Sequence, residues 1–489
     1  MLRPYESKKQ FMLGRSMLRP VHPQEFLMQY LSTRGQIKDL SFKEAVMMGL
    51  ADDGGLLLPE HIPLLPPDEL DSLTDLSYPD LAFNILQRFI DDIPASRLRE
   101  LIQRSYASFT VPEVTPVVKK GNLYILELFH GPTLAFKDVA LQFLGNLFEL
   151  ILAERKERMN IVGATSGDTG SAAIYGVRGK ENINIFIMHP EGRVSPIQEK
   201  QMTTVLDANV FNLAIRGSFD DGQRIVKEIF GDLSFKNEHA LGAVNSINWA
   251  RVLAQVVYYF YAWGQVRKNS NCHDVYFSVP TGNFGDIFAG YIAKEMGLPI
   301  RRLILATNAN NILSRFVRDG DYSIGEVVQT WSPSMDIQIS SNFERYLYYL
   351  HNGDTAAVNA AMKAFKESGR LSFTAEQKAQ ISQDFLTCSV SNDETLATIR
   401  DFYQATGYCL DPHTAIGVKA AQSCAEAPIP VICLATAHPA KFGEAVRQAI
   451  GTDPQRPPCL VGIEEQPSRC ETVDADIEVI KAFVKAHAR

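Results

Sequence analysis

A lysine stands near the end of the segment His130–Asp138, at a point where a loop opens a predicted helix. Lys137 is flanked by Ala135 and Phe136 and lies at the positive end of the helix dipole. Both features disfavour the ammonium form and lower the pKa of the amine, as a lysine that forms an imine requires. An ordinary surface lysine at a helix start would fit the same pattern, so the assignment depends on the loops that follow.

The segment Ala164–Ser171 also joins a predicted strand to a predicted helix. Its glycines and small hydroxyl residues expose backbone N–H groups and hydroxyl donors, which suit a carboxylate or a phosphate. A tight turn in which Thr or Ser caps the helix would have the same composition. The candidate substrate-binding residues of this loop are Thr165, Ser166, Gly167, Asp168 and Thr169.

A third loop, Ser278–Asp286, is again preceded by a predicted strand and followed by a predicted helix. Gly282 and Gly285 would let the backbone approach a phosphate closely. The loop is not a Walker A loop, since no Gly-Lys-Ser/Thr follows, and it is not a G-x-G-x-x-G dinucleotide fingerprint. It therefore predicts a phosphate from a cofactor smaller than NAD or ATP.

Taken together, the three loops indicate a pyridoxal-phosphate enzyme. Lys137 would bond to the cofactor, the loop ending at Asp286 would hold the cofactor phosphate, and the middle loop would take the carboxylate of the substrate. No metal ligand set is predicted.

Four segments resemble those of the threonine synthase family, whose members are fold type II pyridoxal-phosphate enzymes: HGPTLAFKDVALQ, ATSGDTG, VPTGNFGD and TAHPAKF. The N-terminal segments YLSTRG and LADDGGLLLPE resemble the longer members, which carry an extra N-terminal domain. The resemblance runs from about Met28 to about Ala445, and the order and spacing of the motifs make it highly specific.

The resemblance implies a role for several residues. Lys137 matches the Schiff-base lysine. Thr436 matches the hydroxyl residue at the pyridine nitrogen of the cofactor, and Thr414 is a second candidate for that role. The loop that holds the cofactor phosphate is matched by Gly282, Asn283, Phe284 and Asp286, with Gly285 beside them. The substrate-phosphate site of the family is matched by Asn245, Ser246, Asn248 and Arg251.

The resemblance further implies conversion of O-phospho-L-homoserine and water into L-threonine and phosphate. Two kinds of alternative stay open. One is another fold type II enzyme, such as a threonine or serine dehydratase, a cysteine synthase or a phospho-lyase, and the other is a non-catalytic relative. Arg251 separates a dehydratase or a cysteine synthase from the family, because an amino acid without a phosphate gives this arginine nothing to pair with. The intact Lys137, Asp168, Asn283 and Thr436 argue against the second.

The elements that must position these loops follow a repeated strand-loop-helix pattern after Val111, which predicts an α/β fold with parallel sheets. Ligands of such sheets bind at the carboxyl ends of the strands. We expect a disordered extension over 1–27, a small, mostly helical domain over 28–110 and a catalytic region over 111–489. The catalytic region would consist of two α/β lobes around the cofactor, the smaller at about 150–240. Residues 332–410 read as mostly helical and irregular, and the last strand is expected at 430–435.

The composition excludes several classes of protein. The chain has 489 residues with 48 Lys+Arg and 56 Asp+Glu, a net charge of 48 − 56 = −8, which disfavours broad binding to nucleic acid or to anionic membranes. Seven cysteines without a C-x-x-C pair disfavour a disulfide framework. No apolar stretch reaches the ~20 residues that a membrane span needs. We therefore expect a cytoplasmic enzyme that is a monomer or a homodimer.

Overall fold

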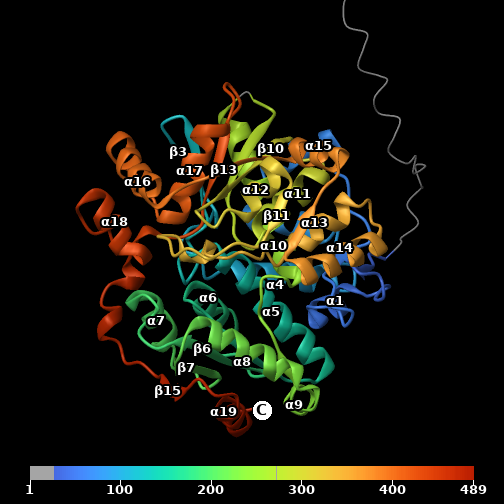
Figure 1. The fold of residues 1–489 in the computed structure, drawn as a ribbon, viewed down its shortest axis with the longest axis vertical. Coiled ribbons are helices and arrows are strands. Elements are labelled where there is room, and N and C mark those ends of the chain that lie inside the picture. The colour runs from blue at the N-terminus through green and yellow to red at the C-terminus, as the bar shows by residue number, and fades with distance from the viewer. Residues whose placement is uncertain (1–26, 271, 489) are drawn as a thin grey trace, which may run out of the picture.

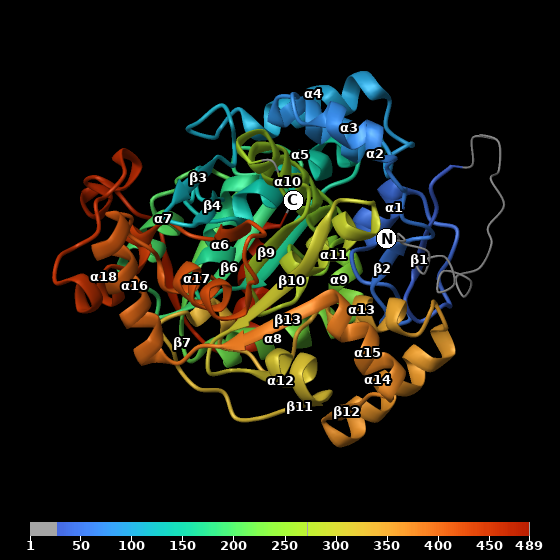
Figure 2. The same cartoon turned by 90° about the horizontal axis from the view of Figure 1, so that it is seen from above.

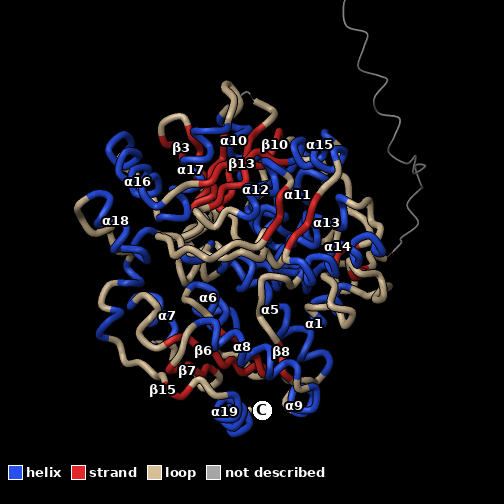
Figure 3. Tube along the Cα trace, viewed as in Figure 1, coloured by secondary structure: helices blue, strands red, loops and turns tan. Residues whose placement is uncertain are grey.

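The computed structural model describes residues 27–270 and 272–488, so the extension expected over 1–27 lies almost entirely outside the described residues. Two parallel sheets dominate the structure and lie toward opposite ends of its long axis (Figure 1; strands in Figure 3). Helices cover their faces, and the predicted α/β architecture with parallel sheets is confirmed. Among the described residues, no helix combines the length and the apolar character needed to cross a membrane.

The first elements form a small unit of helices with one two-stranded sheet. Strand β1 pairs antiparallel with β2, with Tyr30 opposite Pro59. The sequence pattern did not indicate these strands, because three residues are too few to show a period of two. The elements are β1 (Tyr30–Ser32), α1 (Phe42–Met48), β2 (Leu57–Pro59), α2 (Pro67–Leu73), α3 (Tyr78–Leu86) and α4 (Ala95–Tyr106).

The larger sheet has the order β13-β10-β9-β14-β4-β3, and all its neighbouring pairs are parallel except β3 and β4. Strand β13 lies in the region that the sequence predicted as mostly helical, and it is an edge strand that pairs with β10 alone. The strands of the larger sheet are β3 (Val117–Lys120), β4 (Leu123–Glu127), β9 (Val275–Pro280), β10 (Ile300–Thr307), β13 (Phe385–Ser389) and β14 (Val431–Ala435).

Most remaining helices belong to this larger lobe. A short antiparallel pair, β11 (Asp321–Ser323) with β12 (Arg370–Ser372), lies beside them. The helices are α10 (Trp249–Asn269), α11 (Gly285–Glu295), α12 (Ile312–Asp319), α13 (Phe343–Leu350), α14 (Thr355–Ser368), α15 (Ala375–Asp384), α16 (Asn392–Thr406), α17 (Pro412–Cys424) and α18 (Gly443–Ile450).

The smaller sheet has the order β15-β7-β6-β5-β8, with all pairs parallel. Its edge strand β15 and the helix α19 come from the C-terminal end of the chain, far beyond the range 150–240 expected for this lobe and beyond the strand expected to be the last. The sequence Glu-Thr-Val-Asp of β15 is polar and largely exposed, so no apolar run marks it. The elements are β5 (Met159–Ala164), α6 (Asp168–Val177), β6 (Ile183–Pro190), α7 (Pro196–Thr203), β7 (Val210–Arg216), α8 (Phe219–Gly231), α9 (Leu233–Glu238), β8 (Leu241–Gly242), β15 (Glu471–Asp474) and α19 (Ile477–His487).

Helix α5 (Lys137–Arg155) joins the parts of the molecule. It packs against α4, α6 and α10, and Figure 2 shows it between the N-terminal helices and the rest of the structure. Two glycines let α5 and α6 approach closely: a Cβ built on Gly145 would lie 2.0 Å from the carbonyl oxygen of Gly176. A Cβ on Gly176 would lie 2.6 Å from the carbonyl oxygen of Leu141. This contact fixes the relative positions of Lys137 and Asp168, the first residues of the two helices.

Replacing Gly145 by Ala should destabilise the protein, because the added methyl group meets backbone atoms that cannot rotate away. We expect a loss of about 1–3 kcal/mol, seen as a lower midpoint of thermal or urea unfolding. Gly231→Ala in α8 is the matched control, since nothing lies within 4 Å of its Cβ position and Ala favours the helix. Equal midpoints for the two variants would contradict a tight α5–α6 contact.

Candidate active site

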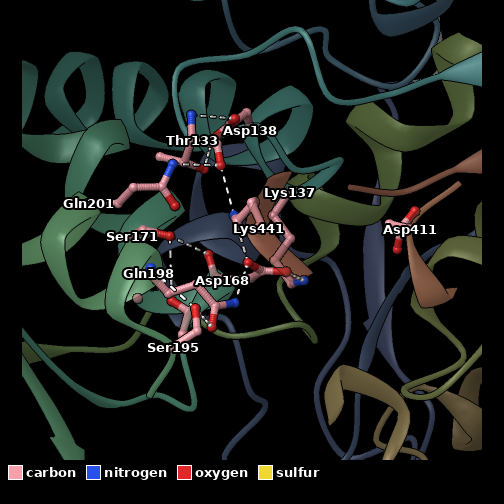
Figure 4. Close-up of polar contacts among 12 residues, drawn as sticks. Thr133, Lys137, Asp138, Asp168, Ser171, Ser195, Gln198, Gln201, Asp411 and Lys441 are labelled. Carbon is pink, nitrogen blue, oxygen red and sulfur yellow. Dashed lines mark hydrogen bonds and ion pairs between the residues drawn. The ribbon is translucent and has the colours of Figure 1, made fainter. Parts of the chain in front are cut away.

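Lys137 begins α5 and is buried. Its Nζ lies 3.4 Å from Oδ2 of Asp168 and 4.7 Å from the centre of the Phe136 ring (Figure 4). Burial lowers the pKa of Lys137, and the neighbouring Asp168 opposes that shift. The environment therefore shifts the amine toward its uncharged, nucleophilic form, in the direction that the sequence predicted.

Asp168 begins α6 and is paired with two lysines. Oδ1 of Asp168 lies 2.6 Å from Nζ of Lys441 and accepts a hydrogen bond of 2.8 Å from Nε2 of Gln198. Although burial alone raises the pKa of Asp168, the two lysines and Gln198 hold it far below its usual range. Asp168 is therefore held in its ionised form, and the N–H and hydroxyl groups of its loop remain the candidates for binding a substrate carboxylate.

The loop before Lys137 is held by bonds to Thr133. The carbonyl oxygen of Thr133 accepts from Nζ of Lys441 at 2.7 Å and from Nε2 of Gln201 at 3.1 Å. The amide and the hydroxyl of Thr133 donate to the carboxylate of Asp138 at 2.8 and 2.6 Å. Burial raises the pKa of Asp138 to about 6. The lysine loop is therefore tied both to α5 and to the residues that surround Asp168.

The loop that follows β5 depends on a glycine. Gly167 has φ +143°, a conformation that other residues rarely adopt, and a Cβ there would lie 2.5 Å from Cδ of Gln198. The hydroxyl oxygen of Thr165 accepts from the amides of Gly167 at 3.0 Å and Gly170 at 2.9 Å. Ser166 is exposed and Thr169 is half-buried. Of the five predicted residues, Thr165 thus shapes the loop, while the hydroxyl groups of Ser166 and Thr169 make no hydrogen bond within the described residues.

The loop that follows β9 is positioned by the segment 340–342, which the sequence analysis did not single out. Oγ of Ser340 donates to the carbonyl oxygen of Gly282 at 2.7 Å. Nδ2 of Asn342 donates to the carbonyl oxygen of Asn283 at 3.1 Å, and a Cβ on Gly285 would lie 3.1 Å from the same Nδ2. A side chain at Gly285 would require the amide of Asn342 to move by a few tenths of an ångström.

Two residues of the same loop point into the protein. Phe284 has φ +63°, and its buried ring packs edge-on against Phe343 at 5.6 Å. The carboxylate of Asp286 accepts hydrogen bonds from the hydroxyl groups of Tyr258 and Tyr259. Burial raises the pKa of Asp286 to about 6. These side chains anchor the loop, so its backbone, together with exposed Asn283, is what remains to meet a phosphate.

Arg251 lies in the first turn of α10 and is buried. Among the described residues, its guanidinium has no hydrogen-bond or ion-pair partner, and its Nη1 is buried without one. Burial lowers the pKa of Arg251 to about 10, and the charge of Asp286 opposes the shift. A buried cation without a partner costs folding free energy, which an incoming anion would offset.

The other residues of the predicted substrate-phosphate site differ in what they can still bind. Oγ of Ser246 lies 2.9 Å from Oγ of Ser341. Asn245 accepts from the amide of Ile247 at 3.2 Å. Asn248 caps α10, and its Nδ2 donates 2.9 Å to the carbonyl oxygen of Val46. Both ends of the Asn248 amide are therefore engaged, and its side chain is structural.

The two threonine candidates for the pyridine nitrogen are now distinguishable. The hydroxyl of Thr414 donates to the carboxylate of Asp411, which caps α17. Thr436 follows β14 and is buried, and within the described part of the chain its hydroxyl makes no hydrogen bond. Thr436 therefore has the free donor that this role needs.

Sequence reasoning missed several residues that hold the site together. Lys441 stands inside the quoted segment TAHPAKF but received no role. Arg345 is fully buried, and its guanidinium donates to Leu57 O at 3.0 Å and to Ile247 O at 2.5 Å, so it ties the N-terminal unit to the segment before α10. For Arg345 and Lys441, only a charge in apolar surroundings could have marked them in the sequence. The full set is Gln198, Gln201, Ser340, Ser341, Asn342, Arg345 and Lys441.

The residues present suit pyridoxal phosphate. Lys137 offers a buried amine of lowered pKa, the loop after β9 offers backbone groups at the start of α11, and Thr436 offers a buried hydroxyl. Lys137, Asp168, Asp286 and Arg251 also interact electrostatically, so their charges share one region.

Comparisons with known proteins agree with this chemistry. Models of three regions match, described as "Threonine synthase N terminus" (29–106), "Pyridoxal-phosphate dependent enzyme" (110–372) and "Threonine synthase, C-terminal" (414–484). A threonine synthase of Schizosaccharomyces pombe is 49% identical over 86% of this chain and 89% of its own length. A threonine synthase of Pseudomonas aeruginosa is 48% identical over 94% of this chain and 98% of its own length.

The crystal structure of a pyridoxal-phosphate-bound threonine synthase from Brucella melitensis superimposes with a TM-score of 0.92 at 47% identity, covering 94% of this chain and all of that one. The predicted fold type II architecture and the predicted cofactor are thereby confirmed. The chain belongs to the threonine synthase family of pyridoxal-phosphate-dependent enzymes.

Proposed function

We propose that the chain converts O-phospho-L-homoserine and water into L-threonine and phosphate. The observation that carries the proposal is the pairing of two features in one buried region: a lysine of lowered pKa and an arginine without a partner. The lysine suits bonding to the cofactor, and the arginine suits a phosphate on the substrate. Relatives of 48–49% identity that carry the name threonine synthase support the same activity.

Lys137 moves protons in this reaction. When bound, pyridoxal phosphate supplies an electron sink for negative charge that develops at the substrate Cα. Once released by the incoming substrate, the uncharged Nζ of Lys137 takes the proton from Cα and later one from Cβ. Its burial excludes bulk water, which keeps the amine uncharged and limits competing hydrolysis.

Arg251 holds the substrate phosphate and stabilises the charge that grows on it as it leaves Cγ. Ser246 supplies a neutral donor beside it, and water then adds at Cβ. Thr436 would offer its hydroxyl to the pyridine nitrogen, where an uncharged partner would leave the ring nitrogen largely unprotonated and weaken the electron sink. That weakening helps to steer which elimination follows.

The alternatives lose support from the same residues. A dehydratase or a cysteine synthase would bring no phosphate for Arg251, which is buried and unpartnered among the described residues. A non-catalytic relative would not require a lysine buried at a helix start beside an ionised Asp168. Phosphate on the substrate is therefore the feature that the site favours.

We also propose the setting in which the enzyme works. Lys137, Asp168, Arg251 and Lys441 all come from one chain, so one copy supplies this constellation, which suits a monomer or a homodimer. All seven cysteines are free thiols, which supports the reducing cytoplasm. The division into an N-terminal domain over 28–110 and a catalytic region over 111–489 stays part of this proposal.

Lys137→Ala should abolish the covalent link to the cofactor. Purified full-length protein mixed with pyridoxal phosphate is expected to be yellow, and the variant is expected to lose that visible absorbance and all turnover. Lys180→Ala is the matched control, because Lys180 is a half-buried lysine in an ion pair with Glu149 at 3.1 Å. A colourless unaltered protein, or a variant that stays yellow, would refute the assignment.

Arg251→Ala should lower kcat/KM for O-phospho-L-homoserine by roughly 100-fold, because a charged, two-pronged contact to phosphate is lost. Arg251→Lys should retain part of the activity, since it keeps the charge without the fork. Threonine and phosphate release measure the rate, and weaker inhibition by inorganic phosphate checks the cause. The unfolding midpoint of Arg251→Ala should not fall, because a buried charge without a partner is removed. Unchanged kcat/KM would show that the substrate phosphate binds elsewhere.

A further inference from the structure

Lys441 is a buried cation that lies beside Lys137 in the site. It lies on the 3-10 helix Pro439–Phe442, which follows β14, and its side chain is 0% exposed, against 8% for Lys137. Two of its three ammonium hydrogens are used, one by Oδ1 of Asp168 at 2.6 Å and one by the carbonyl oxygen of Thr133 at 2.7 Å. Such a group has no accessible surface for a substrate, so it acts through its neighbours.

The single carboxylate of Asp168 is shared unequally between two lysines. Its Oδ1 is 2.6 Å from Lys441, whereas its Oδ2 is 3.4 Å from Lys137 (Figure 4). Lys441, the closer cation, forms the stronger ion pair with Asp168. The positive charge of Lys441 also repels the ammonium form of Lys137. The charged groups that face Lys137 from the surrounding elements are Asp168 on α6, Lys441 after β14, Arg251 on α10 and Asp286 on α11.

We propose that Lys441 is a positioning residue of the active site, which binds Asp168 and the carbonyl group of Thr133 so that the amine of Lys137 stays uncharged and available to the cofactor. The inference rests on the proposed function only in that Lys137 is the residue that bonds to pyridoxal phosphate. Burial and the repulsion by Lys441 both lower the pKa of Lys137, which agrees with this role. Without Lys441, the whole charge of Asp168 would act on Lys137 and favour its ammonium form.

The test follows formation of the bond between Lys137 and the cofactor, which needs the uncharged amine. Full-length protein freed of cofactor is mixed with saturating pyridoxal 5'-phosphate, and the rise in visible absorbance is timed across a series of pH values. Removing Lys441 raises the pKa of Lys137, so the uncharged fraction falls at any pH below it. Lys441→Met should therefore react roughly tenfold more slowly at low pH. The two proteins should react at equal rates at pH values above the raised pKa of Lys137.

Lys441→Arg keeps the positive charge and should react within about twofold of the unaltered protein at every pH. Lys180→Met, which breaks an ion pair to Glu149 elsewhere in the protein, is the matched control and should not change the profile. A purely structural role for Lys441 would slow the reaction by the same factor at all pH values, and that result would overturn the inference. So would identical profiles for Lys441→Met and the unaltered protein.

If Lys441→Met fails to fold, because Asp168 then keeps only the more distant of its two lysines, the comparison moves to the Asp168→Asn background. Adding Lys441→Met there should still shift the profile to higher pH, since the repulsion of Lys137 is removed, and an unshifted profile would overturn the inference. Failure of the proposed function is distinct: the unaltered protein would then release no threonine and phosphate from O-phospho-L-homoserine, whatever the pH profile of cofactor bonding.

Discussion

The active site depends on one buried carboxylate held between two lysines. Asp168 lies deep in the protein, where an unpaired charge would cost several kcal/mol, so its position requires cations at close range. Lys441 and Lys137 provide them, from the segment after β14 and from the start of α5. Because Asp168 begins a helix of the smaller lobe and Lys441 follows a strand of the larger sheet, this cluster also ties the two lobes together at the reacting amine.

Close backbone packing gives that cluster its geometry. The contact of Gly145 with Gly176 sets how α5 and α6 cross, and therefore where Lys137 and Asp168 lie relative to each other. A side chain at either glycine would push the helices apart. The precision of the ion pair is thus a consequence of two residues that carry no chemistry of their own, one turn or more away from the site.

On the other side of the site, the N-terminal unit supports the loops expected to bind phosphate. Glu344 accepts from Thr33 at 2.6 Å and pairs with Arg34 at 3.1 Å, while the neighbouring Arg345 donates to Leu57 and Ile247. Both residues begin α13, directly after the segment 340–342 that carries the loop after β9. An N-terminal extra domain thereby becomes part of the machinery that shapes the catalytic region.

The sequence by itself determined what depends on residues near one another in the chain. It predicted the helix start at Lys137, the glycines of the loops and the parallel strand-loop-helix order, because helix dipoles, turn geometry and short spacings are local. Tertiary structure alone decided which polar groups were already engaged. Asn248 donates a hydrogen bond to Val46, and β15 joins the smaller sheet, and both follow from tertiary packing. It also placed Lys441 against Asp168, 273 positions away along the chain (441 − 168 = 273). Such pairs leave no periodic trace in a sequence, because burial and partner choice are fixed only when distant segments pack together.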